Sequence, residues 1–185
     1  MIVPPAARDV GNERPAHVTA DVDLSLEDLK HLVEWAGHLR EEATQCAEAR
    51  HWRAAFVMCA AAVEAGLAAT VFCLAPELRA QGHLKPKQSI TNLTLAPLVA
   101  IARNAGWLPS VLDGSGDESE ALVGEVGDAI RFLVKLRNLA AHPMAHARDL
   151  PWLDFREPTM ADWFPICLGI ADEVFRHLSL AITAS

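Results

Sequence analysis

Three polar residues near the end of an apolar stretch have the types and the spacing that acid–base chemistry at a phosphate requires: Arg137, Asn138 and His142. Imidazole titrates near neutral pH, so His142 can take a proton from one oxygen or give one to another. The guanidinium of Arg137 can hold two phosphate oxygens and offset the charge that grows at phosphorus. Asn138 lies about one helical turn before His142, where it can orient the ring or bind a phosphate backbone. We expect His142 to be the general acid or base and Arg137 to stabilise the transition state.

A helix predicted over residues 117–141 positions these groups. At 100° per residue Arg137 falls in the middle of an apolar face, where an arginine is costly unless it has a partner. The apolar neighbours within about 60° of it are Ile130, Leu133, Val134, Ala140 and Ala141. The polar side of the helix gathers within an arc of about 80° and supplies Asp128, Arg131, Lys135, Asn138 and His142. Arg131 and Lys135 are therefore expected to support the site with positive charge, and Pro143 to end the helix.

One carboxylate stands alone in the most apolar stretch of the chain. A second helix is predicted over residues 48–74, and Glu64 is its one charge between Ala54 and Ala75. A carboxylate in such a run needs a cation or several hydrogen-bond donors, and Arg137 is the lone cation in the middle of another apolar face. We therefore expect the two side chains to meet. Two interpretations stay open: an ion pair that fixes the register of two helices, or a carboxylate that turns Arg137 towards a phosphate.

The remaining hydrophobic patterns predict an all-α protein, a bundle of about four long helices plus a short one. Ser25 is the expected N-cap of the first helix. A short helix is expected over residues 91–104, or from Pro97 onwards, and the last long helix over residues 160–182. No segment alternates in the way that a half-buried strand does.

The domain organisation follows from composition. Residues 1–22 contain three prolines and no periodicity, which predicts a flexible N-terminal arm. Residues 23–185 are expected to form a single helical-bundle domain, because this length suffices for one core. The second half of helix 117–141 is apolar on more of its circumference than one core needs, which indicates a two-fold homodimer.

A connector is expected over residues 76–89, between the second and third helices. It carries three basic side chains: His83, Lys85 and Lys87. The connector is either an ordinary solvated loop or a local contact for phosphate groups.

The run Arg137-Asn138-Leu139-Ala140-Ala141-His142 resembles the Arg-x4-His motif, often Arg-Asn-x-x-x-His, of HEPN domains. These are all-helical nucleotide-binding and ribonuclease-like domains, and the resemblance in size and helix order covers roughly Leu24 to Leu180. It implies a homodimer in which two motifs face each other across a cleft. It also implies RNA cleavage without a metal ion, leaving a 2′,3′-cyclic phosphate end. Such domains often act as toxins or defence effectors beside an antitoxin partner.

The charge of the chain supports a second hypothesis. A net charge of −8 and a pI of about 5.4 argue against broad, non-specific binding of nucleic acid. The alternative to an endoribonuclease is therefore a non-catalytic helical module for dimerisation or for nucleotide or RNA binding. Exposure separates the two: an Arg137 that faces an open cleft favours catalysis, and an Arg137 sealed against Glu64 favours a structural role.

No metal ion or other cofactor is expected. His142 and His146 have a spacing that zinc could use on a helix, but Pro143 lies between them. The four cysteines show no close metal-type pairing, and reduced thiols fit a cytoplasmic protein. The helix over residues 48–74 is long enough for a membrane span. We expect a core helix instead, because the run is rich in alanine and carries Glu64 near its centre.

Overall fold

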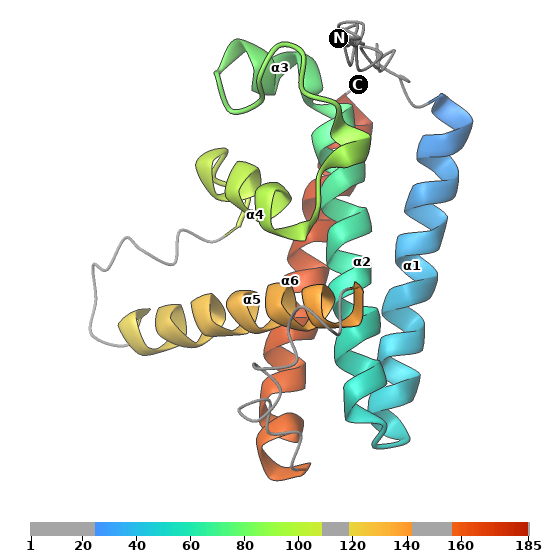
Figure 1. The fold of residues 1–185 in the computed structure, drawn as a ribbon, viewed down its shortest axis with the longest axis vertical. Coiled ribbons are helices and arrows are strands. Elements are labelled where there is room, and N and C mark those ends of the chain that lie inside the picture. Colours follow the sequence, from blue (N-terminus) through green and yellow to red (C-terminus); the bar gives the residue numbers. More distant parts are fainter. Residues whose placement is uncertain (1–24, 109–118, 142–156, 185) are drawn as a thin grey trace, which may run out of the picture.

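The computed structural model describes residues 25–108, 119–141 and 157–184, which form six α-helices and no β-strand (Figure 1). The predicted all-α class is confirmed for this part of the chain, and the arm predicted over residues 1–22 lies outside it. The helices are α1 (Leu26–Glu48), α2 (Trp52–Cys73), α3 (Ala75–Ala80), α4 (Leu95–Asn104), α5 (Ser119–Ala141) and α6 (Glu157–Ala184). A 3-10 turn, η1 (Ile90–Asn92), precedes α4.

Helix α2 is the centre of the arrangement. Helices α1, α2 and α6 lie lengthwise beside one another, whereas α5 crosses α2 and α6 (Figure 1). Helices α3, α4 and α5 lie on the side of α2 away from α1, and α4 contacts both α2 and α5. The C-terminal half of α5 and the chain between α3 and α4 therefore share one side of the protein.

The apolar composition of α2 is explained by its burial. In the described residues it is the one helix that is long and apolar enough to cross a membrane, with a mean hydropathy of 2.0 in its most apolar window. Inside the protein, 61% of that window is buried. Its neighbours are α1, α4, α5 and α6, so a helix that is apolar on most sides is covered on most sides.

Small side chains let α6 approach α2 closely. A Cβ atom built on Gly66 would lie 2.8 Å from Cγ1 of Val174, so a glycine is needed at this contact. One helical turn away on α2, the Thr70 hydroxyl donates to the Gly66 carbonyl over 2.8 Å. Further along, the Cys59 thiol donates to the Cys167 carbonyl over 3.4 Å. Burial raises the pKa of Cys59 to about 12 and also raises the pKa of Cys167.

An aromatic cluster fastens α5 to α2 and α6. Phe56 of α2 meets Phe132 of α5 and Phe164 of α6 edge to face, with ring centroids 5.0 and 5.6 Å apart. Trp163 meets Phe132 in the same way at 5.4 Å. Edge-to-face pairs at these distances add to the stabilisation that comes from burial alone. This cluster fixes the middle of α5 on the core.

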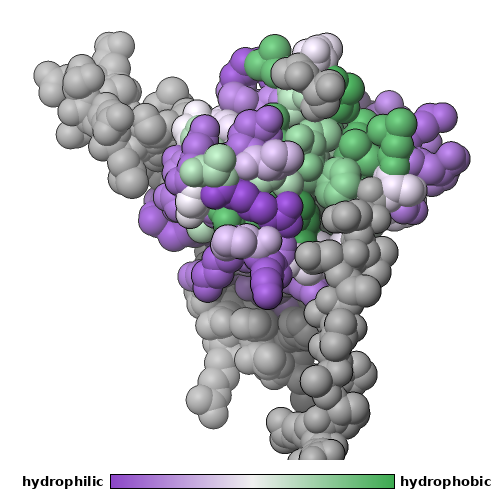
Figure 2. Space-filling view, turned by 90° about the horizontal axis from the view of Figure 1, so that it is seen from above, coloured by the Kyte–Doolittle hydropathy of each residue, from purple (hydrophilic) through white to green (hydrophobic). Residues whose placement is uncertain are grey.

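Apolar surface is exposed at the end of the protein where α1 begins and α6 ends. Leu26 is 83% exposed, Leu180 53% and Ile182 47%. A groove of about 580 Å³ lies between the two helix ends and is lined by Leu26, Leu29, Val33 and Ile182 together with Glu27, Lys30 and Glu34. Figure 2 shows this end with apolar surface between hydrophilic borders.

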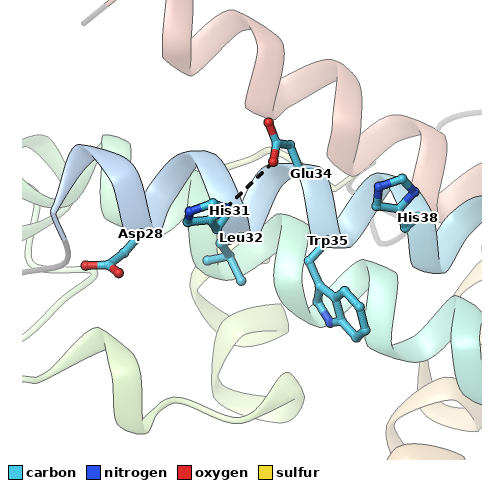
Figure 3. Close-up of a pocket in the computed structure, with 6 residues that line it drawn as sticks. All are labelled: Asp28, His31, Leu32, Glu34, Trp35 and His38. Atoms are coloured by element: carbon cyan, nitrogen blue, oxygen red, sulfur yellow. Dashed lines mark ion pairs between the residues drawn. The ribbon is translucent and has the colours of Figure 1, made fainter.

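The outer face of α1 carries an exposed tryptophan. Trp35 is 58% exposed and lies beside a shallow pocket of about 510 Å³. His31 and His38 lie one turn on either side of it along the helix, and Figure 3 shows all three side chains on the outside of α1. Both histidines are exposed.

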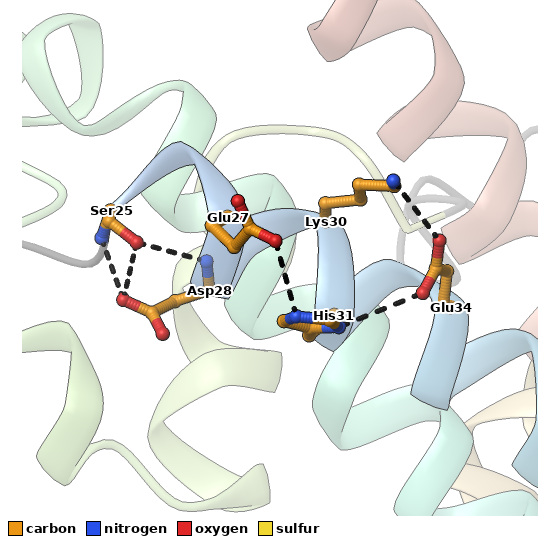
Figure 4. Close-up of polar contacts among 6 residues, drawn as sticks. All are labelled: Ser25, Glu27, Asp28, Lys30, His31 and Glu34. Carbon is orange, nitrogen blue, oxygen red and sulfur yellow. Dashed lines mark hydrogen bonds and ion pairs between the residues drawn. The ribbon is translucent and has the colours of Figure 1, made fainter.

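Helix α1 begins where its sequence predicts. The Ser25 hydroxyl accepts from the Asp28 backbone N–H over 3.1 Å, and the Asp28 carboxylate accepts from the Ser25 backbone N–H over 3.0 Å, which completes a capping box (Figure 4). The hydrogen bonds from Ser25 lower the pKa of Asp28. Further along the helix, Arg40 Nε donates to Asp172 Oδ1 over 2.6 Å, which holds α1 to α6.

Several helix boundaries differ from the prediction. The connector expected over residues 76–89 begins with a helix, α3, because Pro76 stands in the first turn, where a missing N–H costs nothing. The predicted start of the second helix at residue 48 was wrong, because the chain turns at Arg50, whose φ of 59° is left-handed. The short helix α4 begins at Leu95, which places Pro97 in its first turn.

Candidate functional site

Arg137 and Glu64 meet as the sequence predicts. Arg137 Nε donates to Glu64 Oε2 over 2.5 Å, and Nη2 donates to Glu64 Oε1 over 2.8 Å. The two bonds run side by side, so the planar guanidinium and the planar carboxylate are fixed relative to each other. The middle of α2 thereby holds the C-terminal end of α5.

Both side chains of the Arg137–Glu64 pair are partly exposed to solvent. The Arg137 side chain is 27% exposed and that of Glu64 is 18% exposed. The hydrogen bond from Arg137 to Glu64 raises the pKa of Arg137, which keeps the guanidinium charged at any physiological pH. A charged group that keeps contact with solvent at the end of a packed helix can still receive a charged ligand.

The geometry leaves one edge of the guanidinium for another partner. Arginine has five N–H donors, and Glu64 takes one on Nε and one on Nη2. The three others lie on Nη1 and the outer side of Nη2, and none of them is hydrogen bonded to a residue in the described ranges. That edge presents two parallel N–H groups, which is the arrangement that binds two oxygens of a phosphate.

The other predicted basic residues of α5 lie elsewhere. Arg131 and Lys135 are exposed on the opposite side of the helix from Arg137. Arg131 forms an ion pair with Asp128, one turn before it, so its charge is partly offset. These residues are not brought to the Arg137–Glu64 pair, and they contribute at most to the field around it.

Asn138 follows Arg137 and is half-buried. His142 is the next residue after Ala141, the last residue of α5, and lies outside the described residues. The roles assigned to Asn138 and His142 therefore stay predictions.

Sequence reasoning missed a fourth basic residue within the predicted connector, Arg79. Arg79 of α3 donates from Nη2 to the Gln88 carbonyl over 3.5 Å. Its Nε is buried without a hydrogen-bond partner. The available signal was the charge of the segment, because four of the five charged residues between Ala75 and Asn104 are basic.

Metal-ligand clusters are absent from the described ranges, where no group of three or more His, Cys, Asp or Glu side chains converges. The candidate site thus consists of Glu64 and Arg137, with Asn138 beside them. This arrangement holds a guanidinium in a fixed plane at the end of a helix, with three N–H donors that Glu64 does not use.

In comparisons with known proteins, no protein-family model, curated protein or solved structure matches the chain.

Proposed function

We propose that this protein is a metal-independent endoribonuclease of the HEPN type, with a composite site at a homodimer interface. The observation that carries the proposal is the bidentate contact by which Glu64 fixes Arg137 immediately before Asn138 and His142. A pair that only fixes helix register does not require two parallel bonds to a partly exposed guanidinium. A phosphate clamp does, because its donors must point in a set direction.

In the proposed reaction His142 removes the proton of a ribose 2′-hydroxyl. The 2′-oxygen then forms a bond to the adjacent phosphorus, and the bond from phosphorus to the 5′-oxygen breaks. A protonated His142 of the second copy supplies the proton to the departing 5′-oxygen. The products are a 2′,3′-cyclic phosphate and a free 5′-hydroxyl.

Each remaining residue has one task in this scheme. Arg137 offsets the negative charge that grows on the non-bridging phosphate oxygens. Glu64 positions Arg137, and Asn138 orients His142 or binds the RNA backbone. Arg131 and Lys135 add positive potential from the exposed side of α5. The proposal includes a cytoplasmic location without membrane association, a role as a toxin or defence effector, and an antitoxin or other protein as partner.

A second candidate function is a non-catalytic module for dimerisation or for nucleotide or RNA binding. Two observations favour it: Glu64 takes two of the five donors of Arg137, and the chain has a net charge of −8. In this function the pair stabilises the crossing of α2 and α5, and no proton moves.

Cleavage of an end-labelled RNA of mixed sequence by the purified protein, in EDTA, separates the two functions. We expect cleavage with cyclic phosphate ends, and its loss in His142→Ala. The matched control is His38→Ala, because His38 is an exposed histidine on α1, across α2 from α5. No cleavage by folded wild-type protein contradicts the endoribonuclease. Cleavage that survives in His142→Ala contradicts the assignment of the acid or base.

A further inference from the structure

The basic residues of this acidic protein are distributed unevenly. Between Ala75 and Asn104 the charged residues are Glu77, Arg79, Lys85, Lys87 and Arg103, a net charge of +3 (four basic, one acidic) in a chain of net charge −8. Such a local excess of positive charge in an acidic chain attracts polyanions to one region.

These cations also differ from the others in their surroundings. None of Arg79, Lys85, Lys87 and Arg103 forms an ion pair with a residue in the described ranges. Elsewhere acidic partners offset the basic side chains Lys30, Arg40, Arg131, Arg137 and Arg176. Acidic side chains in the described residues therefore do not neutralise the positive charge of these four residues.

The two lysines are held in a defined turn. The Gln88 backbone N–H donates to the Lys85 carbonyl over 3.1 Å, and the Lys85 backbone N–H donates to Gln88 Oε1 over 3.3 Å. Pro86 fixes φ at the second position of this turn. Lys85 and Lys87 are both exposed in this turn and line a hollow of about 690 Å³.

The turn is also anchored to the core. Leu84 before it is 1% exposed and Ile90 after it is 8% exposed. Arg79 donates to the Gln88 carbonyl from beneath, and its buried Nε has no acceptor in the described residues. A loop that is only a solvated connection does not need this many attachments, whereas a ligand-binding turn does, because attachment reduces the entropy lost on binding.

The position of the turn relates it to the candidate site. Glu64 lies ten residues before Leu74, the last residue before α3, which is about 15 Å along α2. Helices α3, α4 and α5 share the side of α2 away from α1, and α4 contacts α5 (Figure 1). A strand a few nucleotides long can thus reach from Arg137 to the turn along one side of the protein.

We propose that the Lys85–Gln88 turn, with Arg79 beneath it, is a second contact for the phosphodiester backbone of single-stranded RNA. It binds phosphates a few nucleotides away from the scissile one and is sequence-independent, since lysine recognises charge rather than a base edge. The inference rests on the proposed function for the identity of the ligand, but it concerns binding and involves no proton transfer.

The test measures RNA binding in a protein that cannot cleave. A fluorescent single-stranded RNA is titrated with His142→Ala protein at several salt concentrations, and anisotropy gives the association constant. Adding Lys85→Gln and Lys87→Gln removes two phosphate contacts. We expect weaker binding, and a plot of log K against log salt concentration that is shallower by about 1.4.

A matched variant controls for net charge. Lys30→Gln with Arg176→Gln removes two exposed positive charges from α1 and α6, both already paired with glutamates. An equal loss of affinity in both double variants overturns the inference, because it shows that overall charge alone matters. Unchanged binding in the Lys85 and Lys87 variant also overturns it.

The results distinguish this inference from the proposed function. Cleavage by the wild-type protein with no effect of the lysine pair overturns the second contact and leaves the nuclease standing. Binding that requires the lysine pair, in a wild-type protein that does not cleave, supports the second contact and contradicts the nuclease.

Discussion

The contacts of helix α2 with α6 and with α5 differ in chemistry. At its contact with α6, small uncharged groups approach closely, Gly66 against Val174 and the Cys59 thiol against a backbone carbonyl, beside the aromatic pair of Phe56 and Phe164. Its contact with α5 joins a large aromatic pair, Phe56 and Phe132, to the ion pair of Glu64 and Arg137. Helix α2 thus approaches α6 closely through small groups, whereas it is joined to α5 by an aromatic pair and an ion pair.

This difference in chemistry indicates that the α2–α5 contact does more than pack two helices together. Replacing a buried ion pair with apolar side chains of similar volume is often neutral or stabilising, so charge is not needed to join two helices. The contacts of Gly66 with Val174 and of Cys59 with Cys167 accordingly involve no charged group. The ion pair at the α2–α5 contact fixes the orientation of the Arg137 guanidinium. A fixed orientation favours ligand binding, because the donors do not have to be ordered when the ligand arrives.

The largest expected effect comes from removing Glu64. Glu64→Ala leaves Arg137 partly buried without its carboxylate, and we expect the free energy of unfolding to fall by about 2–3 kcal/mol. This is below the usual cost for a buried pair, because both side chains keep some contact with water. Urea unfolding of wild type and variant measures the change.

The exposed pair between α1 and α6 is the control for this comparison. Asp172→Ala removes the partner of Arg40, but the two side chains are 36% and 50% exposed, so the expected loss is below about 1 kcal/mol. The double variant Glu64→Met with Arg137→Met should recover most of the stability that Glu64→Ala loses. Equal losses in Glu64→Ala and Asp172→Ala would contradict the distinction between the two pairs.

The second effect is the response of the α2–α6 contact to alkaline pH. Burial raises the pKa of Cys59 from 9.0 to about 12, and raises the pKa of Cys167 as well. Above pH 9 the unfolded thiols lose their protons while the folded ones keep them, so stability is complete below pH 9 and falls as pH rises towards 12. We expect each thiol to contribute a slope of up to about 1.4 kcal/mol per pH unit.

Unfolding at pH 8, 9 and 10 measures this slope. Cys59→Ala with Cys167→Ala should flatten it. Arg137 adds nothing to the slope in this range, because its pKa is raised from an already high value. A double cysteine variant that keeps the wild-type slope would show that other groups cause the loss.

The smallest effect compares two glycines on the helices of that contact. Gly66→Ala places a Cβ 2.8 Å from Cγ1 of the stiff Val174 side chain, so we expect a net loss of about 1 kcal/mol despite the better helix propensity of alanine. Gly169→Ala on α6 meets nothing within 4 Å and should gain about 0.5–1 kcal/mol. Thermal unfolding gives both signs.

A compensating change sharpens the glycine comparison. Val174→Ala removes the atom that the new Cβ would meet, so Gly66→Ala should cost less in the presence of Val174→Ala than alone. If Gly66→Ala stabilises the wild-type protein as much as Gly169→Ala does, the Gly66 backbone lies further from Val174 than the 2.8 Å between the built Cβ and Cγ1 implies.

Local signals in the sequence predicted the helices well. Ser25 is the N-cap that the sequence predicts, and in the structure it also forms a capping box with Asp28. The turn at Arg50 had no such signal, because a left-handed arginine is held by the chain around it rather than by its own preference. Helix α3 was missed because Pro76 signals both the end of one helix and the first turn of another.

The candidate site was predictable where burial left few choices. Glu64 and Arg137 were each the lone charge on an apolar face, so pairing was the least costly arrangement. The crossing of α5 over α2 and α6 was not predictable, because it depends on how Phe56, Phe132 and Phe164 interlock. Arg79 was not recognised because a single arginine on a six-residue helix gives no pattern until the fold places it under a turn.

The central place of α2 has a consequence for synthesis on the ribosome. Of the helices that cover α2, α1 alone is made before it, and α6 is made last of those described. A nascent chain that has passed Cys73 thus carries a helix of membrane-like length and hydropathy with one neighbour to cover it. Such a surface is the kind that chaperones hold until later helices arrive, and protease digestion of chains stalled before Glu157 would reveal it as early cleavage within α2.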